Sequence, residues 1–183
     1  MAANEPDWGA YLGGLAAFAG TLFALVLAAR QIRKPLVENP HPKVSRAYLV
    51  DSIAVTVELG AAASLAVLYE IKESLLFSIA VVVVALSGVG LSLASAVTYA
   101  KARDHFRDDE KFGIVLQGVG NVLPLACYVV SALYAVRVFD MDSGETWGYA
   151  AAVSWLTLSG VVQSIWWYSR IWVEAAPSHS TGA

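Results

Sequence analysis

Residues 75–100 read LLFSIAVVVVALSGVGLSLASAVTYA, a run without a single charged side chain. A helix needs roughly 20 apolar residues to cross a hydrocarbon layer of about 30 Å, and this run is long enough. Its four consecutive valines favour a strand in water. In lipid, however, backbone N–H and C=O groups must bond within their own segment, and a single segment does so only as a helix. The run therefore predicts a transmembrane helix.

Four more stretches have the same character, at about residues 8–29, 47–69, 113–137 and 147–171. The chain of 183 residues is 57% hydrophobic and 15% charged, whereas soluble domains average about 45–50% and about 25%. We therefore predict an all-α polytopic membrane protein, a bundle of five transmembrane helices that forms one domain over residues 1–174. Residues 175–183 are small and polar, which predicts a disordered cytoplasmic tail.

The basic residues predict an orientation for this bundle. Ten of the twelve Lys and Arg residues fall on one side of the predicted membrane, and only Lys72 and Arg137 fall on the other. Because cytoplasmic loops carry the excess of Lys and Arg, the N-terminus should lie outside and the C-terminus in the cytoplasm of a cell membrane. Tyr69 and Tyr149 are expected in an outer belt of aromatic side chains, and Tyr48, Tyr99 and Trp167 in an inner one.

Several classes of function lack support in the sequence. A net charge of −3 argues against nucleic-acid binding. The three histidines lie in predicted loops or the tail, no helix carries a His/Cys metal spacing, and no nucleophile–base motif occurs. We therefore expect no metal, no cofactor and no enzymatic activity. The single cysteine, Cys127, falls in an apolar run, where we expect it to pack as a small hydrophobic residue.

Two carboxylates in the second predicted helix need an explanation. Asp51 and Glu58 are seven residues apart, which places them on one helical face about 10 Å apart along the axis. Glu58 should lie near the bilayer midplane, where an ionisable group is a functional candidate by default. Asp51 should lie at the cytoplasmic edge, within reach of water, in a structural role. Arg170 ends the fifth helix at a similar depth and is a candidate ion-pair partner for Asp51.

The fourth predicted helix carries a polar face made of Gln117, Asn121, Pro124, Tyr128 and Ser131, at spacings of four, three, four and three. Pro124 removes a backbone hydrogen bond and is therefore a candidate hinge. Counting residues from the helix ends puts Asn121 at the depth of Glu58.

The fifth helix contributes Gln163, at the depth of Gln117. Glu58, Asn121, Gln117, Gln163 and Ser87 would then form one polar layer between the midplane and the cytoplasmic side. The alternative is that these amides make only interhelical hydrogen bonds, worth about 0.6 kcal/mol each.

These residues lead to two hypotheses of different classes. The first is a small channel or carrier, or a subunit of one, for an ion, protons or a small polar solute, working with the lipid bilayer and with a second copy or a partner subunit. The second is a membrane scaffold or accessory protein that binds another membrane complex. A Glu58 that faces lipid or a fully bonded helix contact would favour the second hypothesis.

Overall fold

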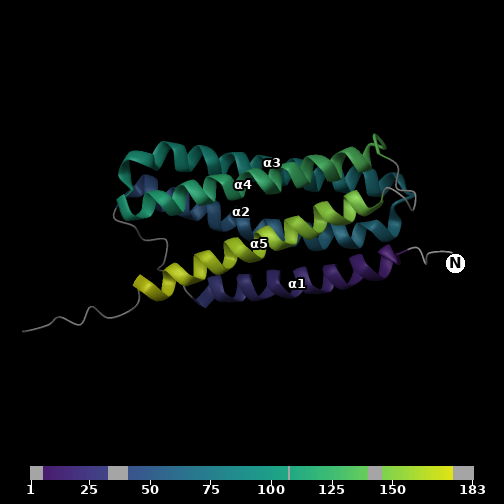
Figure 1. Ribbon diagram of the computed structural model, residues 1–183, viewed down its shortest axis with the longest axis horizontal. Coiled ribbons are helices and arrows are strands. Elements are labelled where there is room, and N and C mark those ends of the chain that lie inside the picture. The colour runs from purple at the N-terminus through teal and green to yellow at the C-terminus, as the bar shows by residue number, and fades with distance from the viewer. Residues whose placement is uncertain (1–5, 33–40, 107, 140–145, 175–183) are drawn as a thin grey trace, which may run out of the picture.

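The computed structural model describes residues 6–32, 41–106, 108–139 and 146–174, with the side chains of 30–32, 108–119 and 168–174 left out of the description. The described chain is all-helical, as predicted, and its five long helices run along one axis (Figure 1). These are α1 (Trp8–Ile32), α2 (Pro42–Leu68), α3 (Leu75–Ala102), α4 (Asp108–Ala135) and α5 (Thr146–Glu174). Two short 3₁₀ segments, η2 (Tyr69–Ile71) and η3 (Arg103–His105), follow α2 and α3.

Local side chains explain several helix ends. Asp7 accepts a hydrogen bond from the N–H of Ala10 at 2.9 Å and so caps α1, and Ser74 accepts one from Phe77 at 3.2 Å and caps α3. Helix α2 starts at Pro42, five residues earlier than predicted, because a proline at the first helical position sacrifices no hydrogen bond. Helix α4 likewise starts five residues early, at Asp108.

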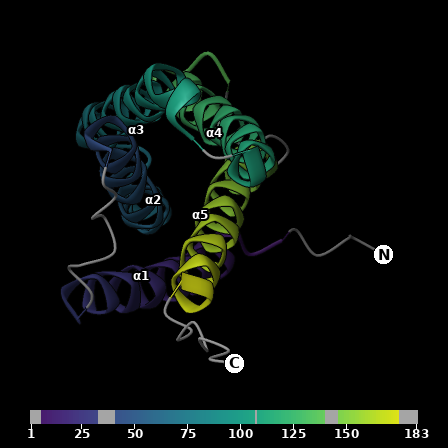
Figure 2. The same ribbon diagram turned by 90° about the vertical axis from the view of Figure 1, so that its left-hand side faces the viewer.

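The helices pack with α2 and α5 between α1 and the α3–α4 pair, as the end-on view in Figure 2 shows. Helix α2 contacts α1, α3 and α5, and α4 contacts α3 and α5. Helix α1 begins at one end of the bundle and α5 finishes at the other (Figure 1), as expected for an odd number of helices that alternate in direction.

Three helices are long and apolar enough to cross a membrane: Trp8–Ala29 in α1, Pro42–Ile71 from α2 into η2, and Leu75–His105 from α3 into η3. Among the described residues, α4 offers a shorter apolar stretch, Gly120–Ala135. Helix α5 carries several hydroxyl side chains. Thr157 and Ser164 donate theirs to backbone carbonyls one turn earlier, those of Val153 and Gly160. Spanning by α4 and α5 stays a prediction.

The bundle interior repeats at intervals of seven residues on four helices, which gives three layers about 10 Å apart. The contacts described below between Asp51, Ser95, Asn121 and Trp167, and between Gly88 and Tyr128, set the alignment of the helices. In the layers that follow, the α2, α3, α4 and α5 members are given in that order, and all are buried except the half-buried Trp167. The layers are Asp51, Ser95, Asn121 and Trp167; then Glu58, Gly88, Tyr128 and Gly160; then Leu65, Val81, Ala135 and Val153.

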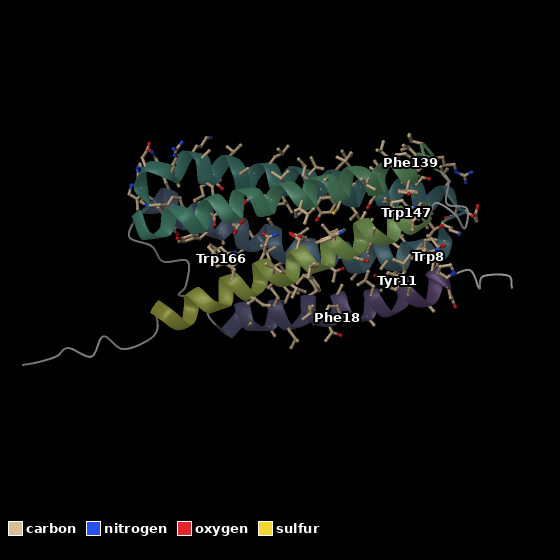
Figure 3. The ribbon with its side chains drawn as sticks, in the orientation of Figure 1. Trp8, Tyr11, Phe18, Phe139, Trp147 and Trp166 are labelled. Atoms are coloured by element: carbon tan, nitrogen blue, oxygen red, sulfur yellow. The ribbon has the colours of Figure 1, made fainter. Side chains whose placement is uncertain are left out.

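Two aromatic residues of the predicted outer belt are buried inside the bundle. Tyr149 is fully buried and donates its hydroxyl hydrogen to the carbonyl of Leu65 at 2.7 Å, and the buried Tyr69 stacks on its ring. Both belong to the core and not to an outer belt. Trp8 and Trp147 do lie at the end where α1 begins, with Trp166 towards the opposite end (Figure 3).

Candidate functional site

Asp51 is the centre of a hydrogen-bonded cluster that joins three helices. Its side chain is fully buried. Ser95 Oγ donates to Oδ1 at 2.7 Å, while Tyr99 Oη and Trp167 Nε1 donate to Oδ2 at 3.2 Å and 2.9 Å. The expectation that Asp51 lies within reach of water is therefore wrong. Donors from α3 and α5 take the place of water around the carboxylate.

Asn121 belongs to this same cluster. Its Nδ2 donates to Ser95 Oγ at 3.3 Å, so α4 reaches Asp51 through the serine hydroxyl. Its described hydrogen bond thus goes to the Asp51 cluster, and the depth that it was predicted to share with Glu58 stays a prediction. The cluster thus contains one side chain from each of α2, α4 and α5 and two from α3.

Aromatic rings close the cluster on the side of the basic residues. Tyr48 lies within 5.4 Å of the Trp167 ring centroid and 5.8 Å of the Phe106 centroid, and Phe106 stacks on Tyr99 at 5.8 Å. The rings exclude water from the carboxylate, so each of its hydrogen bonds acts in a low-dielectric surrounding.

Glu58 lies one layer away and is bonded differently. Gln163 Nε2 donates to Oε2 of Glu58 at 3.0 Å and to Ser159 Oγ at 2.9 Å, which links α2 to α5. The other carboxyl oxygen, Oε1, is buried and accepts no hydrogen bond from the described part of the chain. A buried polar atom left in this state costs about 1–3 kcal/mol, and more if it is charged.

Helix α4 faces this carboxyl. Cys127 and Tyr128 of α4 lie within electrostatic range of Glu58, and the Tyr128 ring occupies the space where Gly88 on α3 has no side chain. Ser131, one turn further along α4, has a buried hydroxyl for which the described residues offer no partner. Two orphaned polar oxygens thus lie on the inner faces of α2 and α4.

The buried residues of α4 match the predicted polar face. Asn121, Pro124, Tyr128 and Ser131 are all buried, and α4 passes through Pro124 as one continuous helix. Hinge motion at Pro124 stays a prediction. Ser87 does not join the site, because it is exposed and its hydroxyl bonds to the carbonyl of Val83 at 2.8 Å.

Two predicted site side chains, Gln117 and Arg170, lie outside the described side chains, and so does the proposed Asp51–Arg170 ion pair. Three donors to Asp51 were not predicted as site residues: Ser95, Tyr99 and Trp167. The available signal is spacing, since Ser95 and Tyr99 are four residues apart on the inner face of α3. Trp167 carries no such signal, because a tryptophan near a helix end is equally typical of a membrane anchor.

Chemically, the two carboxyls offer what a proton or a cation requires, which is a negative or ionisable oxygen screened from water. Comparison of the chain with protein-family models, with curated proteins and with solved structures finds no match.

Proposed function

We propose that the chain is a small membrane channel or carrier, or a subunit of one, for protons, another ion or a small polar solute. Glu58 is the proton- or cation-responsive group. The observation that carries the proposal is the state of this side chain, which is 4% exposed with one oxygen bonded to Gln163 and the other without a partner. It neither faces lipid nor sits in a fully bonded helix contact.

The energetics favour a use for this carboxyl. Inserting a charged side chain at the centre of a helix costs about 2.5–3.5 kcal/mol, a penalty that hydrogen bonds to both oxygens would offset. The bundle offsets it on one oxygen only. Oε1 is therefore available for a proton, a water molecule or a cation that arrives between α2, α4 and α5.

The other residues take supporting roles in this proposal. Asp51 forms a second carboxyl station nearer the end that carries most of the Lys and Arg residues. Gln163 donates to the Glu58 carboxyl, and Asn121 donates to Ser95, which in turn donates to Asp51. Gln117 is an additional amide ligand, and Pro124 is the hinge. The basic end faces the cytoplasm, and a homo-oligomer or a partner subunit widens the pathway beyond what five helices enclose.

The test is flux through the purified chain in sealed vesicles. Protein is reconstituted into liposomes that contain a pH-sensitive dye, a potassium diffusion potential is applied, and the rate of internal pH change is measured. Glu58→Gln keeps the shape of the side chain and its ability to accept from Gln163 but cannot ionise. Glu73→Gln, in the exposed turn after η2, is the matched control.

The expected result is a proton flux that Glu58→Gln abolishes and Glu73→Gln leaves unchanged, with both variants folded by circular dichroism. Repeating the assay with sodium and potassium gradients separates proton from cation transport. A Glu58→Gln protein with every measured flux equal to that of the parent would refute the proposal.

One observation favours the scaffold alternative. The small residues of α1 do not all face the bundle, since Ala24 and Ala28 are exposed while the buried face consists of Leu12, Ala16, Ala19 and Val26. Exposed small residues permit close approach of another membrane helix. Co-purification with a larger membrane complex that Ala24→Leu disrupts, without any flux, would favour this alternative.

A further inference from the structure

Two histidines from different loops meet at the basic end of the bundle. His41 immediately precedes α2, and His105 ends η3 between α3 and α4. Their ring centroids are 3.9 Å apart with an interplanar angle of 72°. The contact joins residues separated by 64 positions. Because the two histidines lie in different loops, no ligand spacing along one helix predicts this pair.

The two rings differ in exposure, and the Nδ1 atom of His41 is buried. His105 is exposed and His41 is partly exposed. The pKa of His41 is lowered by partial removal of its ring from water, then by the neighbouring His105 and the ammonium of Lys43. The neutral imidazole is the form that binds metal. The exposed Arg103 and Asp104 directly precede His105 in the chain.

We propose that His41 and His105 form a binding site for one divalent transition-metal ion of the zinc and copper class. Imidazole nitrogens suit these ions, which they bind at about 2.0–2.1 Å in the case of zinc. The exposed His105 turns about its side-chain torsions to direct one nitrogen at the same point as a nitrogen of His41. Within the described residues no third His, Cys, Asp or Glu joins them, so water completes the coordination.

Binding at this site has a structural consequence. The ion ties the start of α2 to the turn between α3 and α4, and both segments border the aromatic rings that close the Asp51 cluster, through Tyr48 and Phe106. The proposed metal site does not depend on the proposed transport function, because it rests on His41 and His105 alone.

The test uses the full chain purified without a polyhistidine tag, in detergent, at pH 7.5. Zinc affinity is measured by isothermal titration calorimetry, and the nitrogen ligands of bound Cu²⁺ are counted by electron paramagnetic resonance. The variants are His41→Ala, His105→Ala and the double variant. His179→Ala is the matched control because His179 is the one other histidine.

We expect one Zn²⁺ per chain and two imidazole nitrogens on Cu²⁺. Removing a group that only hydrogen-bonds to a metal ligand typically weakens metal affinity about 10–100-fold. Removing His41 or His105 itself should therefore weaken zinc affinity at least about tenfold. His179→Ala should bind as the parent does. Circular dichroism verifies that the variants fold. The proposal is overturned if the double variant binds zinc as tightly as the parent, or if copper keeps the same nitrogen ligands in it.

Discussion

Replacing Gly88 by alanine should destabilise the bundle, although the same change elsewhere on α3 should not. A Cβ built on Gly88 overlaps the ring of Tyr128 on α4, whereas one built on Gly90 meets nothing within 4 Å. The two glycines are two residues apart on one helix, so they share the same backbone context. Gly90→Ala is therefore a matched control.

Two effects of opposite sign set the magnitude. Alanine is better than glycine inside a helix by about 1 kcal/mol, which stabilises both variants. Overpacking a well-packed core costs typically about 1–3 kcal/mol. Tyr128 is only 1% exposed and cannot easily move its ring, so the upper end of that range applies. Gly88→Ala should lose about 2 kcal/mol net and Gly90→Ala should gain up to about 1 kcal/mol.

The assay is thermal unfolding in detergent, followed by circular dichroism at one fixed scan rate. For a chain of this length, 1 kcal/mol shifts Tm by about 2–4 °C, so the two variants should differ by about 6–12 °C. Adding Tyr128→Leu to Gly88→Ala makes room for the new methyl group and should remove most of its cost. Equal melting temperatures for the two alanine variants, or no rescue by Tyr128→Leu, would show that the packing of α3 on α4 is wrong.

Two further predictions concern the basic end of the bundle. Trp167→Phe removes the donor to Asp51 at 2.9 Å. Interhelical hydrogen bonds average about 0.6 kcal/mol and reach about 1.7 kcal/mol, so the expected loss of stability lies in this range. Equilibrium unfolding should show this loss for Trp167→Phe but not for Trp155→Phe, which lies on the exposed face of α5. In a chain that already carries Asp51→Asn, Trp167→Phe should cost less. An equal loss with and without Asp51→Asn would contradict the hydrogen bond. The second prediction concerns pH. In the folded chain the pKa of His41 is lowered by partial burial and then by His105 and Lys43. Just below about pH 6.5 the unfolded chain therefore binds more protons than the folded chain, so the free energy of unfolding should fall as the pH is lowered through this window. Melting curves between pH 7.5 and 5.5 test this: the fall should shrink in His41→Asn, and an unchanged fall would assign it to other groups.

The helices and their inner faces were predictable because hydrophobic length and helical period are local properties. Five apolar stretches gave five helices, and the spacing of Asn121, Pro124, Tyr128 and Ser131 identified a face that is buried. The pairing of Glu58 with Gln163 was also anticipated as membership of one polar layer. The helices and the buried face follow from periodicity alone, whereas the polar layer also required counting residues from the helix ends.

The alignment of one helix against another was not predictable in the same way. Successive layers are only about 10 Å apart, and α4 starts five residues before the hydrophobic stretch that marked it. An uncertainty of a few residues in where a helix starts is enough to move a side chain from one layer to the next. Counting from the predicted helix end therefore does not predict that Asn121 bonds to Ser95 in the Asp51 cluster.

The hydrogen bonds of Asp51 also bear on how the chain is assembled during synthesis. Once α2 and α3 have formed a hairpin, Asp51 can bond to Ser95 and Tyr99, whereas Trp167, the donor from α5, is synthesised later. Until α5 arrives, the carboxylate is short of a partner and the bundle is open on that side. A chain that ends before α5 therefore leaves the Asp51 carboxyl without its Trp167 donor and without the helix that covers it on that side.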